Sequence, residues 1–372
     1  MAPFEFQASL RMQLRGAAER EQRRGLLARL AAAGRAILPG VGHSLVPAAA
    51  VAATIAAAIS VAAIFLMSDA EQRPVAPPEV VAELSLADSV GATFGAFGSV
   101  WMADTTRDEL LRVDPDSRRV VGRLPVAGEL ALGVGAGSLW ALQEGQSRKS
   151  RGGFALNGPL LRIDPRTNRV TARIALGTVA GQPFAGYEVL DGRNEVWVAG
   201  VSGAVRIDPQ TNRVTQAIAA PDQLVSTHFA LLDGDLWATT EDGRLLSFDS
   251  RTGRTVSDVR LGLPEARDLS NGPGGGLIAT APGAVARVEP YSGRVLWRAR
   301  LGPSVDVWTA AGGLIWVRSS GQGKDRLSAL DPETGRVVTR VELEDFGAAG
   351  LAAIDDELWL STVAGNVVVM RR

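Results

Sequence analysis

Residues 160–170 read L-L-R-I-D-P-R-T-N-R-V, and this stretch decides the fold because the chain repeats it. Variants of it begin at Leu110, Ala204, Leu245, Val285 and Leu327. A second pattern, centred on a tryptophan, recurs seven times at spacings of 38 to 57 residues, with Ile278 in place of the tryptophan in one copy. Self-similarity at a period of about 40 residues is typical of a repeat architecture. The copies of the second pattern lie at residues 99–103, 138–142, 195–199, 235–239, 276–280, 314–318 and 357–361.

Each repeat predicts four strands, namely a strand of small residues, the tryptophan strand, the strand that ends in Asp-Pro and a strand after the turn. Units of four strands and about 40 residues are typical of β-propeller blades, which bury their faces against one another. The last repeat stops at Arg372 without a fourth strand, whereas residues 80–86 resemble a fourth strand without a repeat of their own. We therefore predict an all-β, seven-bladed propeller over residues 79–372, closed by pairing residues 80–86 with residues 366–370 of the last blade.

The recurring acidic residue and the recurring tryptophan both suggest structural roles. An Asp before Pro starts a turn by accepting backbone N–H bonds, and a Gly or Asn four residues later takes the left-handed conformation. One tryptophan per blade at a fixed strand position is expected to pack between blades. The turn residues are Asp114, Asp164, Asp208, Asp249, Glu289 and Asp331, and the left-handed positions are Asn168, Asn212, Gly253, Gly293 and Gly335.

The D-P-x-T-x-R-V and G-x-x-W-V-A patterns of residues 79–372 resemble those of the YncE-like and virginiamycin B lyase-like propeller family. The resemblance implies the propeller fold, in proteins that are extracytoplasmic or cytosolic. Virginiamycin-type lyases pair histidines with a carboxylate and magnesium at the channel mouth. His228 is the only histidine of residues 79–372, so the resemblance does not carry that activity or metal over to this chain. Residues 291–297 also resemble a blade of pyrroloquinoline-quinone-type propellers, but one copy implies no cofactor.

Composition excludes several classes of function. The formal net charge is −1, which gives no long-range field for nucleic acid. The chain has no cysteine, and therefore no disulfide, thiolate metal site, cysteine nucleophile or lipidated cysteine. We accordingly expect no cofactor, with a divalent cation considered only if the protein is an enzyme.

The first 78 residues predict a membrane anchor. Residues 45–67 form a run of 23 residues without a charge, which at about 1.5 Å per residue can span about 30 Å of hydrocarbon. Residues 1–44, partly helical, carry seven arginines and three glutamates, so the positive-inside rule predicts a cytoplasmic N-terminus and a propeller outside the cell membrane. Residues 68–78 form a Pro-rich linker. A buried soluble helix and a cleaved signal peptide are the alternatives for residues 45–67.

Two insertions distinguish one side of the predicted ring. Trp140 and Asp164 are 24 residues apart, against 11 to 15 in the other repeats, which places an insertion at residues 144–157. A second insertion falls near residues 178–184. In a propeller, the connections that hold these two insertions emerge on the same face, so we expect a binding surface there. The basic residues of the first insertion are Arg148, Lys149 and Arg151, for which a solvated flexible loop is the alternative.

Polar residues also gather at the starts of several first strands, at the channel mouth on that face. Converging ionisable groups in a concave mouth are the default hypothesis for a site. We expect a module that binds an extracytoplasmic protein, glycan or other envelope ligand; the alternative is a lyase or hydrolase that uses Glu188, His228 and Asp268. The other candidate ligand-binding residues are Tyr187, Thr227, Arg267, Asp306 and Trp308.

Overall fold

The computed structural model describes residues 75–144, 156–192, 195–200, 202–220, 229–240, 242–263, 265–266, 268–321, 324–343 and 348–372. Residues 1–74, which include the predicted Arg-rich segment and membrane-spanning helix, lie outside this part of the chain. Within the described ranges no helix is long and apolar enough to cross a bilayer.

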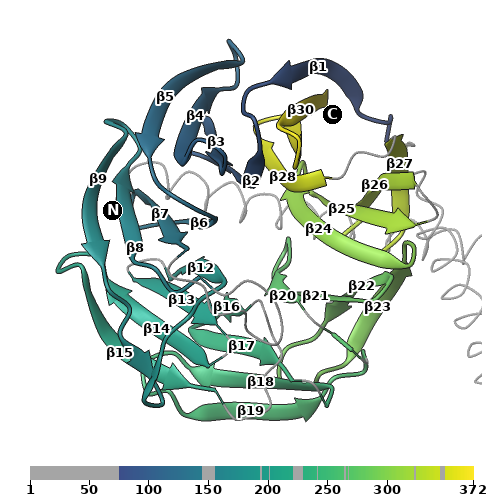
Figure 1. The fold of residues 1–372 in the computed structure, drawn as a ribbon. Helices are drawn as coiled ribbons and strands as arrows, with labels where there is room; N and C mark the ends of the chain where they lie inside the picture. Colours follow the sequence, from purple (N-terminus) through teal and green to yellow (C-terminus); the bar gives the residue numbers. More distant parts are fainter. Residues whose placement is uncertain are drawn as a thin grey trace, which may run out of the picture. The chain divides into compact units, whose positions relative to one another are not determined.

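Seven four-stranded antiparallel sheets form a ring, as Figure 1 shows, and this confirms the predicted seven-bladed propeller. Blades 1 to 7 are numbered by their first strands, which lie nearest the centre of the ring. These inner strands are β2 (Val90–Ala96), β6 (Leu130–Gly135), β12 (Glu188–Asp191), β16 (Ala230–Leu232), β20 (Asp268–Asn271), β24 (Ser304–Ala311) and β28 (Ala348–Ile354).

The second strand of each blade carries the tryptophan pattern, and the third carries the Asp-Pro pattern. The second strands are β3 (Ser99–Asp104), β7 (Ser138–Gln143), β13 (Val196–Gly200), β17 (Asp235–Thr239), β21 (Leu277–Ala281), β25 (Leu314–Gly321) and β29 (Glu357–Thr362). The third strands are β4 (Glu109–Asp114), β8 (Leu160–Asp164), β14 (Gly203–Asp208), β18 (Arg244–Asp249), β22 (Ala284–Val288), β26 (Lys324–Leu330) and β30 (Asn366–Arg371).

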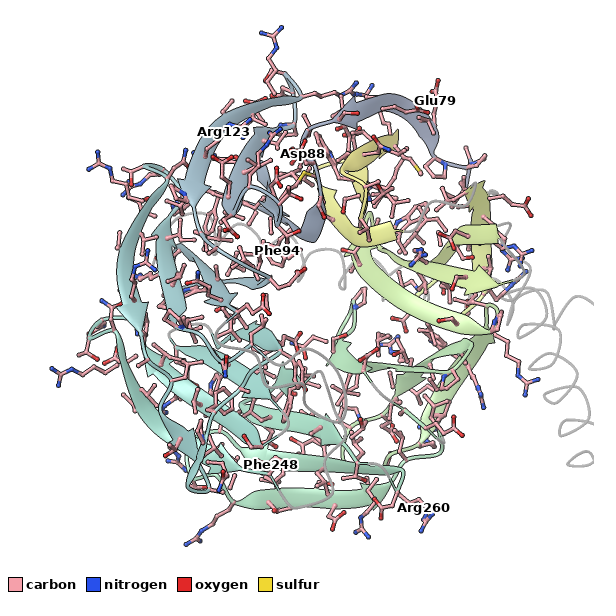
Figure 2. All side chains as sticks on the ribbon, viewed as in Figure 1. Glu79, Asp88, Phe94, Arg123, Phe248 and Arg260 are labelled. Atoms are coloured by element: carbon pink, nitrogen blue, oxygen red, sulfur yellow. The ribbon has the colours of Figure 1, made fainter. Side chains whose placement is uncertain are left out.

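The fourth strands form the outer rim of the ring, where Figure 2 shows Arg123 and Arg260, whereas Phe94 lies on the inner strand β2. Blade 7 takes its fourth strand from the start of the ring, because β1 (Glu79–Ser85) pairs with β30 and Val80 lies opposite Met370. This pairing confirms the predicted closure. The other fourth strands are β5 (Arg119–Pro125), β9 (Arg169–Ile174), β15 (Arg213–Ala219), β19 (Thr255–Arg260), β23 (Val295–Arg300) and β27 (Val337–Leu343).

A β-bulge recurs between the third and fourth strands of blades 1 to 6. In blade 1 the register shifts between Arg112 and Val113, so that Val121 on β5 has no opposite residue. A bulge increases the local twist and turns side chains to new directions. It therefore explains why Val121, Val256 and Leu296, each the extra residue of its bulge, are exposed although they are apolar.

The tryptophans of the second strands form the core between blades, as predicted. All six are at most 1% exposed, and Ile278 takes the corresponding position in blade 5. Small residues of the inner strands allow the blades to approach closely near the centre of the ring. A Cβ atom on Gly95 of blade 1 would lie 2.3 Å from the carbonyl oxygen of Ala353 in blade 7, so only glycine fits there.

Candidate functional site

The ends of the two insertions meet between blades 2 and 3, on the face of the ring that we call the insertion face. The second insertion contains a short hairpin, β10 (Thr178–Val179) and β11 (Gln182–Pro183). Leu156, at the end of the first insertion, exchanges two backbone hydrogen bonds of 2.9 Å with Gly186, at the end of the second. These bonds join the end of the first insertion to the end of the second, and residues 145–155 of the first insertion lie outside the described residues.

Apolar side chains fix the described parts of both insertions to the ring. Leu156, Val179 and Phe184 are 6%, 1% and 3% exposed and belong to the core cluster between blades 2 and 3. A Cβ atom on Gly186 would lie 2.6 Å from the Cγ1 atom of Val198, which shows how closely this connection crosses β13. The segments around Leu156 and Gly186 are therefore part of the packed structure and can support a site.

A cavity of about 390 Å³ opens on the insertion face between the inner strands of blades 2 and 3, which lie side by side in Figure 1. We call it the acidic cavity. Apolar and acidic residues share its wall with one tyrosine, which is typical of sites that bind a small group of defined polarity. Its lining residues are Glu129, Leu130, Ala131, Glu144, Leu156 and Tyr187.

Two glutamates that line the acidic cavity lie at the ends of neighbouring strands of blade 2. Glu129 precedes β6 and Glu144 follows β7, and their backbones are joined by a hydrogen bond of 2.8 Å from the amide of Glu144 to the carbonyl of Glu129. The Glu144 carboxylate accepts a 3.3 Å hydrogen bond from the Glu129 amide. Burial raises the pKa of the Glu129 carboxyl above its usual range, and the nearby charge of Glu144 raises it further. Glu129 is thus poised to hold a proton more readily than an ordinary glutamate.

A second cavity, of about 330 Å³, lies on the other side of the Leu156–Gly186 connection and is mainly apolar. Chain segments from both insertions line it. The two cavities therefore flank the connection between the insertions. Its lining residues are Asn157, Gly158, Pro159, Ala175, Leu176, Gly177, Pro183 and Phe184.

The predicted mouth residues that the structure describes have hydrogen bonds within the wall of the ring. Glu188 and Asp268 begin the inner strands of blades 3 and 5 and occupy the same register position in their blades. The Glu188 carboxylate accepts a 3.0 Å bond from the Phe229 amide of the next blade. The Asp268 carboxylate accepts a 2.8 Å bond from the Thr280 hydroxyl of the neighbouring strand. Both carboxylates thus have structural partners.

Of the remaining predicted residues, one lines the acidic cavity, two have a described backbone only, and the others lie outside the described residues. Tyr187 lines the acidic cavity, and its amide donates a 2.8 Å bond to the Ala199 carbonyl. Asp306 and Trp308 lie in β24, where the backbone alone is described. Outside the described residues lie Arg148, Lys149, Arg151, Thr227, His228 and Arg267.

The repeated turn carboxylates have the structural role that their sequence position predicts. Asp208, for example, accepts a 2.8 Å bond from the Gln210 amide and a 2.9 Å bond from the Thr211 hydroxyl. Such amide donors, with hydroxyl groups beside them, lower the pKa of Asp114, Asp164 and Asp208. The Thr252 hydroxyl and the Arg294 guanidinium lower the pKa of Asp249 and Glu289. These carboxylates are therefore ionised at neutral pH and hold their turns.

Glu129 was not among the predicted site residues, although it satisfies the criterion that selected Tyr187, which is a polar residue at the start of an inner strand. Tyr187 lies one residue before β12, and Glu129 lies one residue before β6 in the preceding blade. The apolar Leu130 and Ala131 conceal the polar start of blade 2 in the sequence. Only the three-dimensional arrangement shows that Glu129 meets Glu144. In the described part of the chain, no group of three or more acidic or histidine residues converges as metal ligands.

The fold and the site together define a seven-bladed β-propeller with an elaborated face over blades 2 and 3. Residues 281–372 match the family described as outer membrane protein assembly factor BamB. The solved structure of selenomethionine-substituted virginiamycin B lyase from Staphylococcus aureus superposes with a TM-score of 0.60. It is 13% identical in sequence, and the superposition covers 78% of this chain and 98% of the lyase. Comparison with curated proteins finds no match. At this identity the likeness to the lyase establishes the fold alone.

Proposed function

We propose that this protein is a membrane-anchored binding module whose propeller lies outside the cytoplasm and captures a protein, glycan or other envelope ligand through the insertion face. The observation that carries the proposal is the connection of the two insertions at Leu156 and Gly186, with a cavity on each side of it. Propellers commonly bind through elaborated connections on a rigid ring. The match of residues 281–372 to the BamB family agrees with a location in the cell envelope.

The anchor and the location rest on the sequence. The uncharged residues 45–67 are long enough to span a bilayer, and the excess of arginine in residues 1–44 orients the propeller away from the cytoplasm. A protease added to intact spheroplasts is expected to degrade the propeller of the full chain. Protection of the propeller in intact spheroplasts, with degradation after lysis, would contradict the proposed location.

Site-specific photocrosslinking tests the insertion face in the full chain. A benzophenone amino acid replaces the exposed Gln182 on β11, and a control carries it at the exposed Arg251 in an Asp turn of blade 4. We expect a discrete adduct from position 182 in intact cells and none from position 251. The same adducts from both positions, or none from position 182, would contradict the proposal.

A shortened first insertion gives an independent test. Replacing residues 145–155 with a short turn keeps Glu144 in the acidic cavity and keeps the buried Leu156. We expect ligand capture to fall at least tenfold while the melting temperature stays within about 2 °C, because the removed residues lie between two anchored ends. Undiminished capture would show that the insertion does not recognise the ligand.

A lyase or hydrolase is the second candidate, and the raised pKa of Glu129 beside Glu144 favours it. A carboxyl group whose pKa is raised by its surroundings serves as a general acid in many enzymes. Mass analysis of the captured ligand separates the two functions. A hydrolase would release a ligand of changed mass, and a lyase would release fragments or, where elimination opens a ring, an isomer of the same mass with a changed fragmentation pattern. Glu129→Gln would release the ligand unchanged, and a binding module would release the unchanged ligand from both proteins.

A further inference from the structure

A third cavity lies on the face of the ring opposite the insertion face, where the Asp turns are. A cavity of about 500 Å³ spans blades 1 to 3, and its wall holds three arginines and one aspartate, a net charge of +2. We call it the arginine cavity. The charged lining residues are Arg112, Arg162, Arg166 and Asp164.

Two of the three guanidinium groups are held rigidly by the ring. Arg112 donates from Nε to the Ser99 hydroxyl at 2.8 Å and from Nη1 to the Pro165 carbonyl at 2.6 Å, and it stacks over Trp101. Arg162 repeats this arrangement one blade further, with its Nε 2.9 Å from the Ser138 hydroxyl and its guanidinium over Trp140.

Both arginines keep one donor group for a ligand. Within the described residues, no hydrogen bond of Arg112 or Arg162 uses Nη2. A guanidinium whose position is already set loses little conformational entropy when it binds an anion. The two side chains are thus prepared to contact a ligand in the arginine cavity.

Blade 5 provides an internal comparison, because its equivalent arginine has a counter-ion. In blade 5, Arg287 donates to the Pro332 carbonyl of blade 6 at 2.9 Å, as Arg112 does to Pro165. There Glu333, which follows Pro332, forms a 2.7 Å ion pair with Arg287, and the Gly275 carbonyl accepts from Nη2 at 3.1 Å.

Arg166 occupies the position of Glu333 in the arginine cavity. It follows Pro165, just as Glu333 follows Pro332, so a second cation replaces the counter-ion. Among the described residues, the one acidic group paired with it is Asp164, at 3.8 Å, and the Asp164 carboxylate already accepts a 2.9 Å bond from the Arg166 amide. The local positive charge therefore exceeds what the turn itself balances.

We propose that the arginine cavity binds a small organic anion, whose carboxylate or phosphate group is surrounded by Arg112, Arg162 and Arg166. Both groups match the donor geometry of guanidinium. The cavity volume of about 500 Å³ accommodates a small metabolite. The site is on the face opposite the insertions, so it is independent of the function proposed above.

Titration calorimetry on the full chain in detergent tests this proposal, with phosphate, citrate and chloride at equal ionic strength as the probes. We expect saturable binding of phosphate, citrate or both at one site, and none of chloride. Stronger binding of phosphate identifies a phosphate ligand, and stronger binding of citrate identifies a carboxylate ligand. Absence of saturable binding with both probes would overturn the proposal.

Charge variants locate the binding site. Arg166→Glu places at this position the residue type that Glu333 has in the equivalent turn, and we expect at least tenfold weaker binding of the anion. Arg166→Gln only removes the charge and should weaken anion binding about threefold. Arg173→Glu is the control, because it makes the same charge change on exposed β9 of the same blade, and its affinity should stay within twofold of the unmodified chain. Equal weakening by Arg166→Glu and Arg173→Glu would show general attraction instead of a site and would also overturn the proposal.

Discussion

Arg112 of blade 1 donates a 2.6 Å hydrogen bond to the carbonyl oxygen of Pro165, in the Asp turn of blade 2. Its guanidinium lies 5.7 Å from the ring centre of Trp101 in its own blade. One side chain thus joins the core of a blade to the turn of the next. Arg162 makes the same connection from blade 2, whereas Arg287 of blade 5, where Ile278 replaces the tryptophan, donates to the turn of blade 6.

Arg112→Met is expected to lower the free energy of unfolding by about 1–3 kcal/mol, because the carbonyl group of the buried Pro165 loses its donor. Urea unfolding followed by tryptophan fluorescence measures the change. Arg123→Met is the control, since it removes an ion pair with Glu109 at the exposed rim and should cost less than about 1 kcal/mol. Equal losses in both variants would show that the bond to Pro165 has no special role.

A disulfide should form across the closure of the ring. Ser85 of β1 lies opposite Asn366 of β30, both are exposed, and 281 positions separate them in a chain without cysteine. Ser85→Cys combined with Asn366→Cys should stabilise the oxidised protein by up to about 5 kcal/mol, because the bond closes a very long loop. Comparing melting with and without reductant measures the effect.

The control for this disulfide keeps Asn366→Cys and moves the first cysteine to Glu79, which lies opposite Arg371 at the other end of the same strand pair. We expect no crosslink from this pair. A crosslink in the control, or none between positions 85 and 366, would contradict the observed register.

Gly335 and Gly253 occupy equivalent turns but differ in their surroundings. Both have positive φ angles, 68° and 72°. A Cβ atom would lie 2.4 Å from the Trp297 ring at Gly335, but 3.3 Å from its nearest neighbour at Gly253. Both alanine variants should lose about 1–2 kcal/mol through backbone strain. Gly335→Ala should lose about a further 1–3 kcal/mol through overpacking, and similar unfolding midpoints of the two variants would contradict this account.

Glu129→Gln should stabilise the protein at neutral pH, by an amount that shrinks as the pH falls through the raised pKa of Glu129 and is lost near the usual glutamate pKa of about 4.5. The pKa of Glu129 is raised in the folded state, so its contribution to stability is fully present below the unfolded pKa and is lost as the pH rises through the folded pKa. Melting temperatures of both proteins between pH 4 and 8 test this. Glu83→Gln on the exposed side of β1 is the control, and a pH-independent difference for Glu129→Gln would contradict the assignment.

Local patterns predicted much of the fold. Gly335 and Asn168 take the left-handed conformation that their turns require, and six strand tryptophans form the core between blades. The unpaired fourth strand at residues 80–86 predicted the closure with β30. The turns and the tryptophan core follow from hydrogen bonds and packing that recur in each repeat, and the closure follows from the number of strands. The sequence shows both the repeat and the number of strands.

The candidate site could be predicted only in part. Unequal repeat spacing predicted both insertions, whose ends meet at Leu156 and Gly186, and the polar start of blade 3 indicated Tyr187, which lines the acidic cavity. The proximity of Glu129 to Glu144 was not predicted, because it depends on how the ends of β6 and β7 meet at an insertion. The sequence offered Glu188 and Asp268 as candidate catalytic residues of the enzyme alternative but did not show where their side chains point, and the structure gives both carboxylates partners in the wall.

The sequence by itself determined the repeat, the number of blades and the role of Asp164 in its turn, because these depend on residues close together in the chain. Only the tertiary structure decided that Arg112 meets the turn of Pro165 and shares a cavity with Arg166. That relationship depends on the angle between neighbouring blades. The packing of all the cores between the blades determines this angle. Because of this packing, arginines from neighbouring repeats line one cavity, and their positive charge exceeds the negative charge of its wall.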